Sequence, residues 1–379
     1  MKQKHILKYL DKPLFIITAI LFLFGLIMVF SASNVTAYMN GGSPYSYFIR
    51  QGLFLLIGSC LFLFLIKFNT KVYGIVSHFL LFVIIAILLL LLIYGKATNY
   101  AISWIKIGGF TIQPSEFAKV IMIVFIARYY EINEKRLDNW LVSSVPLLVG
   151  MGITFLIVCQ PDLGTAIIFA LLVGLLFLAV PIPKKVKANI IIFIVLSGVV
   201  VVCFLLMAGK SLIHQRQLER FNFLRPCDRL LSTGNQVCNG YIAINNGGLT
   251  GIGLGNSTQK YLYLPYPYTD FIYAVVIEEL GVIVGILLIL AYLYVIYRIL
   301  KIGKASFTNR GAIICYGVAS YIFLHVVVNL MGLFGLMPMT GVPLPFISYG
   351  GSFTICLIVA LTLVQRVQIE TKIREAKLR

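Results

Sequence analysis

Three carboxylates lie close together in residues 263–281, a segment that reads YLPYPYTDFIYAVVIEELG. Asp270 falls near the start of an apolar stretch, and Glu278 and Glu279 follow within it. A carboxylate in a segment that enters hydrocarbon is unfavourable, so such residues usually border a polar cavity or a reaction site. Asp270, at the boundary between water and membrane, is a candidate general base that accepts a proton from a hydroxyl. Glu278 and Glu279 are expected to have structural roles on the helix face.

The residues just before Asp270 decide how its carboxylate is presented. Pro265 and Pro267 prevent regular helix there. Thr269 is expected to cap the first turn of the following helix. Free N–H groups and the helix dipole favour an anion at that turn. Two interpretations are open: Asp270 is a reacting base, or it only stabilises the start of the helix.

A second group of polar residues begins with Gln113 and Pro114. Proline is favoured in the first turn of a helix, and so is an acid such as Glu116. Glu116 and Lys119 are three residues apart and therefore share a helical face. Either they form an internal ion pair, or Lys119 faces a phosphate of a substrate. Asp162, in a very short hairpin, is expected to cap the helix that follows it.

The longest polar segment covers about residues 209–268. Its basic residues include Arg216, Arg220 and Lys260. They either bind an anionic substrate or have no such role, because long loops are translocated whatever their charge. The Gly- and Asn-rich run at 245–256 suits tight turns and a close approach of the backbone to a ligand.

Two cysteines, Cys227 and Cys238, share this loop. Thiols outside the membrane can oxidise, and Gly234 and Asn235 between them allow the chain to turn back. The pair is a candidate disulfide; the alternative is two free thiols.

A third irregular segment, residues 338–352, contains three prolines and three glycines between two apolar stretches. Irregular backbone at membrane depth is tolerated where it is buried in protein or lines a wet cavity. Ser348 in this segment is a candidate substrate contact. His325 and Asn329, four residues apart in the preceding apolar stretch, are expected to make interhelical hydrogen bonds.

These segments belong to a chain of 379 residues that is 60% hydrophobic and only 12% charged. This composition indicates an all-α polytopic membrane protein, expected to form one transmembrane domain over residues 1–379. About ten apolar stretches are long enough to cross a bilayer of roughly 30 Å. They cover approximately residues 14–33, 50–66, 75–94, 114–130, 141–159, 163–180, 188–208, 269–297, 311–335 and 350–366.

Basic residues recur at alternate junctions between these stretches, starting with Lys2, Lys4 and Lys8. The positive-inside rule then places both termini in the cytoplasm and the loop 209–268, between the seventh and eighth spans, outside. The net charge of +18 therefore reflects topology and contacts with lipid rather than nucleic acid binding.

Three motifs together carry a family resemblance. They are WIKIGGFTIQPSEFAK at 104–119, TDFIYAVVIEELG at 269–281 and GVPLPFISYGGS at 341–352. In this order around a large outer loop, the chain resembles the SEDS proteins (shape, elongation, division and sporulation), which include FtsW, RodA and SpoVE. The resemblance covers essentially the whole chain. Departures from the family pattern at Tyr266 and Tyr268 leave both the division and the elongation branch open.

The resemblance implies a peptidoglycan glycosyltransferase that polymerises lipid II at the outer face of the bacterial cytoplasmic membrane. It implies a class B penicillin-binding protein as partner, and it places the essential aspartate of the family at Asp270 and its acid–base pair at Glu116 and Lys119. The donor implied is a glycan on undecaprenyl pyrophosphate. Candidates for holding the pyrophosphate are the basic side chains named above and a divalent cation, Mg²⁺ or Mn²⁺, at Asp270.

Two other functions are open: a lipid II flippase or transporter, and a non-enzymatic scaffold for the penicillin-binding protein. Polar residues that gather towards the outer face favour the enzyme, because a flippase needs them in both leaflets.

Overall fold

The computed structural model describes residues 7–94, 103–107, 110–193, 196, 226–229, 234–261 and 263–378. Over these residues the chain is mostly helical, which confirms the predicted class. One short hairpin departs from the all-α prediction: β1 (Ile105–Ile107) pairs antiparallel with β2 (Phe110–Ile112).

The helices follow one another with short connections over most of the chain. They are α2 (Lys12–Met39), α3 (Ser46–Leu65), α4 (Thr70–Tyr94), α5 (Pro114–Ile132), α6 (Trp140–Cys159), α7 (Leu163–Ala179), a helical stretch over 184–193, α10 (Asn235–Gly247), α11 (Ile272–Ala305), α12 (Asn309–Leu333) and α13 (Gly351–Leu378), with the 3-10 helices η1 (Leu7–Tyr9), η2 (Glu134–Arg136) and η3 (Pro226–Arg229).

Among the described residues, seven helices are long and apolar enough to cross a membrane: α2, α3, α4, α6, α11, α12 and α13. α5 and α7 coincide with the predicted fourth and sixth stretches, and α7 is shorter at 17 residues. Most of the predicted stretch 188–208 lies outside the described residues.

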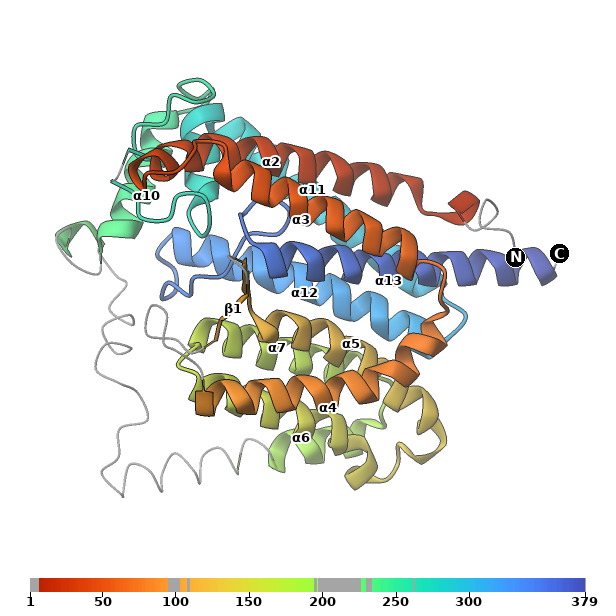
Figure 1. Ribbon diagram of the computed structural model, residues 1–379. Coiled ribbons are helices and arrows are strands. Elements are labelled where there is room, and N and C mark those ends of the chain that lie inside the picture. The colour runs from red at the N-terminus through yellow and green to blue at the C-terminus, as the bar shows by residue number, and fades with distance from the viewer. Residues whose placement is uncertain are drawn as a thin grey trace, which may run out of the picture.

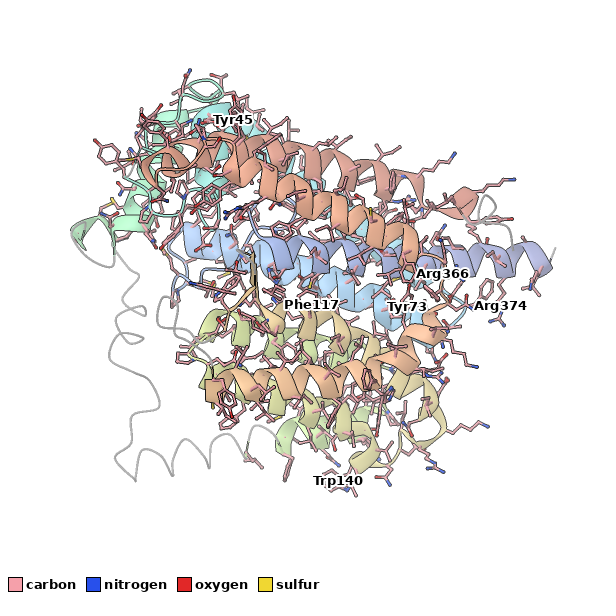
Figure 2. All side chains as sticks on the ribbon, in the orientation of Figure 1. Tyr45, Tyr73, Phe117, Trp140, Arg366 and Arg374 are labelled. Carbon is pink, nitrogen blue, oxygen red and sulfur yellow. A yellow bond between two sulfur atoms is a disulfide. The ribbon has the colours of Figure 1, made fainter. Side chains whose placement is uncertain are left out.

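The long helices run side by side along one direction (Figure 1). Of the most apolar part of each helix, 72% is buried in α12 and 83% in α13, against 17% in α3 and 28% in α4. α12 and α13 therefore form the centre of the bundle, while α3 and α4 present apolar side chains outwards. The start of α2 and the end of α13 lie at one end of the bundle, and α10 and β1 lie at the other (Figure 1). Figure 2 shows Arg366 and Arg374 at the first end and Tyr45 at the second.

Local sequence explains where two helices near the site begin. Pro114 is the first residue of α5, with Gln113 at the N-cap. Asp162 caps α7 by accepting a hydrogen bond from the backbone N–H of Thr165 at 3.2 Å. Gln113 Nε2 also donates to Asp162 at 2.9 Å, which joins the two helix starts. Gln113, Pro114 and Asp162 thus have the structural roles that the sequence predicts.

The start of α11 differs from the prediction. Phe271 is the N-cap residue and makes no capping bond with its side chain. Thr269 instead donates its hydroxyl to Tyr266 O at 3.1 Å, because residues 266–270 are still turning. The predicted Thr269 cap is wrong, and Asp270 lies in the turn before the helix rather than inside it.

α11 is broken at Gly281, whose φ of 86° and ψ of 165° are not helical. The loop after α10 inserts its backbone at this break and takes up the groups that the helix leaves unpaired. Four hydrogen bonds do this: Ile252 N and Gly253 N donate to Glu278 O (3.0 Å) and Glu279 O (2.9 Å), and Val282 N and Ile283 N donate to Gly248 O (3.0 Å) and Leu249 O (3.3 Å). A Cβ at Gly281 would lie 2.2 Å from Leu249 O. The glycine-rich run, predicted to approach a ligand, here approaches α11.

Candidate active site around Asp270

Asp270 borders a small pocket between the start of α11, the end of α12 and the segment that follows α12. The pocket is lined by Asp270, Phe271, Val328, Asn329, Gly332, Leu333, Met339, Thr340, Gly341 and Val342. Gly341 has a φ of 68°, and a Cβ built on it would lie 3.5 Å from Oδ2 of Asp270. The carboxylate therefore faces a backbone position where no side chain stands.

The surroundings of Asp270 change its acidity. Burial raises the pKa of Asp270 from its ordinary value of 3.8 to about 6, although a side-chain hydrogen bond with Thr269 lowers this pKa. Desolvation disfavours the charged form, which explains the direction. A carboxyl with this pKa is mostly ionised at neutral pH and is a stronger base than an ordinary aspartate, which suits general base catalysis.

Residues 338–350 form a strap, the irregular segment between α12 and α13, and it is fixed to the chain around Asp270. Ser348 Oγ donates to Thr269 O at 2.6 Å and accepts from Leu344 N at 2.8 Å. Tyr349 N donates to Tyr268 O at 2.9 Å. Ser348 is buried and its hydroxyl is fully engaged within the protein. The structure therefore gives Ser348 a positioning role in place of the predicted contact with substrate.

Three tyrosines pack together beside this segment: Tyr47 of α3, Tyr268 and Tyr349. The ring centroids of Tyr47 and Tyr268 lie 4.6 Å apart, and those of Tyr47 and Tyr349 lie 5.1 Å apart. The hydroxyls of Tyr268 and Tyr47 are 3.3 Å apart. Tyr268, one of the departures from the family pattern, thus packs as a buried aromatic two residues before Asp270.

Glu116 and Lys119 form a buried ion pair. Lys119 Nζ lies 2.8 Å from Glu116 Oε1, and both side chains are almost fully buried. His325 Nε2 lies 2.9 Å from Lys119 Nζ, and its Nδ1 lies 3.3 Å from Pro343 O. Because an ammonium can only donate, Nε2 must accept and Nδ1–H must donate to Pro343 O. The internal pair is thus the arrangement observed, and His325 connects it to the strap.

Lys260 is also paired within the protein. Its Nζ lies 2.9 Å from Glu279 Oε1 and donates to Gly255 O at 2.6 Å, and neither Lys260 nor Glu279 is exposed. Ser31 Oγ, from α2, donates to Glu279 at 2.7 Å. This ammonium is surrounded by protein groups, so Lys260 fixes the loop to α11 and does not make the predicted contact with a phosphate.

Glu278 holds the neighbouring part of the loop. Its carboxylate accepts from Thr258 Oγ1 at 2.9 Å, from Thr258 N at 3.2 Å, from Asn246 Nδ2 at 3.2 Å and from the hydroxyl of Ser257. Both carboxylates are therefore structural groups that fix the loop to the part of α11 before Gly281, as the sequence predicts.

The predicted disulfide is present: Cys227 in η3 is bonded to Cys238 in α10, with 5.0 Å between their Cα atoms. Asn239, the next residue, donates from Nδ2 to Tyr263 O at 2.6 Å and so ties α10 to the chain that leads to Asp270. Arg216 and Arg220 lie outside the described residues.

Within the part of the chain that the structure describes, no three His, Cys, Asp or Glu side chains come together as a metal site. Two neighbours of Asp270, Gly341 and Asn329, were not predicted as site residues. The concentration of glycine and proline at 338–352 was the available signal for Gly341, whereas nothing in the sequence distinguishes Asn329 from an ordinary interhelical hydrogen-bonding residue.

A family profile described as “Cell cycle protein”, FTSW_RODA_SPOVE, matches residues 12–373. The chain is 35% identical over 383 residues to “Probable peptidoglycan glycosyltransferase FtsW” of Bacillus subtilis, covering 99% of this chain and 94% of that protein. It is 35% identical over 356 residues to “Stage V sporulation protein E” of the same organism, covering 93% and 94%.

Two solved structures share the fold. One is described as “Structural coordination of polymerization and crosslinking by a peptidoglycan synthase complex”; its matched chain has a TM-score of 0.77 and 23% identity, covering 96% of this chain and 98% of that one. The other is the rod shape determining protein RodA of Thermus thermophilus, with a TM-score of 0.65 and 23% identity, covering 95% and 96%.

Proposed function

Because the chain belongs to the FTSW_RODA_SPOVE family, we propose that it is a peptidoglycan glycosyltransferase that polymerises lipid II for cell division or cell elongation. Several relatives at 34–36% identity, over nearly their full length, are named as probable enzymes of this activity. The observation on this chain that carries the proposal is Asp270: a carboxylate with a pKa raised to about 6, set beside a pocket and facing a glycine.

The reaction assigns Asp270 the role of general base. A hydroxyl of the acceptor lipid II attacks the anomeric carbon of the glycan linked to undecaprenyl pyrophosphate. Asp270 takes the hydroxyl proton, the new glycosidic bond forms with inversion, and the bond to the pyrophosphate breaks, releasing that group as an anion. The buried ion pair of Glu116 and Lys119 acts at a distance, through His325 and the strap.

The pyrophosphate requires positive charge. Lys119 and Lys260 are both engaged in buried ion pairs, so the proposal rests on Arg216 and Arg220 of the long loop. A divalent cation, Mg²⁺ or Mn²⁺, would have Asp270 as its protein ligand and would complete its shell with substrate oxygens and water.

The chain is a multi-pass protein of the bacterial cytoplasmic membrane, and we propose a single unit of ten spans with both termini in the cytoplasm. The start of α2 and the end of α13 lie at one end of the bundle, and α10 lies at the other (Figure 1). A disulfide at the α10 end supports an extracytoplasmic position for the long loop.

The proposed partner is a class B penicillin-binding protein. A structurally similar chain comes from a structure described as a peptidoglycan synthase complex that coordinates polymerization and crosslinking, which supports a partner that performs the crosslinking step.

The experiment is polymerisation of labelled lipid II by the purified protein with its partner, followed by gel separation of the glycan. Asp270→Asn keeps the shape of the side chain and removes the base, so we expect a loss of about 10²- to 10⁴-fold. Asp228→Asn, at an exposed position of the long loop, is the matched control and should keep full activity. Polymer at the normal rate from Asp270→Asn would contradict the role of Asp270. Lipid II transfer across vesicles without polymer would favour the flippase, and neither activity would favour the scaffold.

A further inference from the structure

Asn329 of α12 is buried beside Asp270 and is only half satisfied. It is 5% exposed and lines the pocket. Its Nδ2 donates to Asp270 O at 2.9 Å and to Val342 O at 2.8 Å. Its Oδ1 has no hydrogen-bond partner among the described residues. Buried polar atoms are nearly always paired in native proteins, so this oxygen requires an explanation.

The orientation of the Asn329 amide follows from its partners. Both hydrogens of Nδ2 are used on two carbonyl oxygens, one on each wall of the pocket. If the amide were flipped, Oδ1 would face two other acceptors, which is repulsive. The carbonyl of the side chain is thus held in one direction, and the group it lacks is a donor.

We propose that Oδ1 of Asn329 accepts a hydrogen bond from an O–H or N–H group of the sugar that is bound at Asp270. This inference rests on the function proposed above and deepens it. Ionised phosphate oxygens only accept hydrogen bonds, so a pyrophosphate cannot satisfy Oδ1. The donor that pairs with Oδ1 is therefore assigned to the acceptor sugar held at Asp270 and not to the pyrophosphate.

The test compares lipid II with analogues that each lack one donor of the terminal sugar. In one analogue a hydroxyl other than the reacting one is removed, and in another the nitrogen of the acetamido group is methylated. Each enzyme form is assayed with the same partner protein, and kcat/KM is measured for every substrate. The two kinds of analogue distinguish a hydroxyl from an amide N–H as the donor.

For the unmodified protein we expect one analogue to reduce kcat/KM by about 5- to 10-fold, as for one lost hydrogen bond. Asn329→Leu removes the acceptor and should use all analogues equally, at a lower overall rate. Asn329→Ser, whose side chain is too short to place an oxygen at the same point, is the second deletion if the Leu variant does not fold.

The inference is overturned if Asn329→Leu or Asn329→Ser discriminates among the analogues as strongly as the unmodified protein. It is also overturned if the unmodified protein treats all analogues alike, which would mean that water satisfies Oδ1. An unmodified protein that forms no polymer from lipid II would instead remove the proposed function, a result that is distinct from either of these.

Discussion

Lowering the pH should inactivate the enzyme by protonating Asp270. The pKa of this carboxyl is raised to about 6 by burial, from an ordinary value of 3.8. A general base works only in its ionised form. With a pKa of about 6, about nine-tenths of Asp270 is ionised at pH 7 and about one-tenth at pH 5. We therefore expect kcat/KM for lipid II to fall about tenfold between pH 7 and pH 5. An ordinary aspartate would still be more than about nine-tenths ionised at pH 5.

The assay measures the initial rate of polymer formation at low lipid II concentration between pH 4 and pH 8. Under these conditions the acid limb reports the ionisation of the free enzyme. Thr269→Val is the matched variant: when the Thr269 hydroxyl rotates from Tyr266 O to the Asp270 carboxylate, its hydrogen bond lowers the pKa of Asp270. The inflection of the acid limb of this variant should move to higher pH. An acid limb with its inflection near pH 4, or an inflection that Thr269→Val leaves unchanged, would refute the reasoning.

Stability provides a second measurement with a defined sign. The pKa of Asp270 is higher in the folded chain than in the unfolded chain, so the folded chain binds more protons between about pH 4 and pH 6. The contribution of Asp270 to the free energy of unfolding therefore increases as the pH falls from about 6 to about 4. Melting in detergent should show that Asp270→Asn lacks this contribution.

Three further predictions concern other parts of the structure. Single alanine variants of Glu116 and Lys119 each leave a buried charge without its partner, at a cost of about 3–5 kcal/mol. The double variant should therefore melt at a higher temperature in detergent than either single variant. A double variant that loses as much stability as both singles combined would show that the pair is not coupled. A membrane-impermeant maleimide added to intact cells should label Cys227 and Cys238 only after reduction, because the two are bonded; labelling of both without reduction would contradict the disulfide. Gly341→Ala introduces a methyl group about 3.5 Å from the Asp270 carboxylate, at a φ of 68°. The backbone strain should lower stability, measured by melting, by about 1–2 kcal/mol, and the methyl group should reduce kcat/KM for polymerisation by more than this loss of stability explains. Unchanged kcat/KM would show that substrate does not pass this position.

The sequence predicts best what is determined locally. Pro114 and Asp162 mark helix starts because a missing N–H and a carboxylate near free N–H groups act within one turn. The Glu116–Lys119 pair is predictable because three-residue spacing places both side chains on one helical face.

Contacts between distant segments could not be predicted in the same way. Lys260 lies in a basic loop, so its sequence context indicates an anionic substrate, whereas its actual partner Glu279 is decided by the packing of the loop on α11. The break at Gly281 was missed because the apolar pattern continues through it. The hydrogen bonds that stabilise the break come from the backbone of 248–253, which residue types do not reveal. Asn329 was predicted to make interhelical hydrogen bonds, whereas it donates to Asp270 O in the turn before α11 and to Val342 O in the strap. Its unpaired oxygen depends on where those segments end.

The break at Gly281 has a consequence for the depth of the site in the bilayer. From Val282 to Ala305, α11 has about 24 residues and a length of about 36 Å, more than the roughly 30 Å of hydrocarbon that a span must cross. The part after the break is therefore long enough to cross the membrane alone, and we propose that Ile272–Leu280 extends beyond the hydrocarbon into the headgroup layer. Glu278 and Glu279, whose carboxylates are buried against the loop, are then not placed in hydrocarbon, and we expect Asp270 at the level of the lipid phosphates. A lipid-linked pyrophosphate can reach this level while its hydrocarbon chain stays in the membrane.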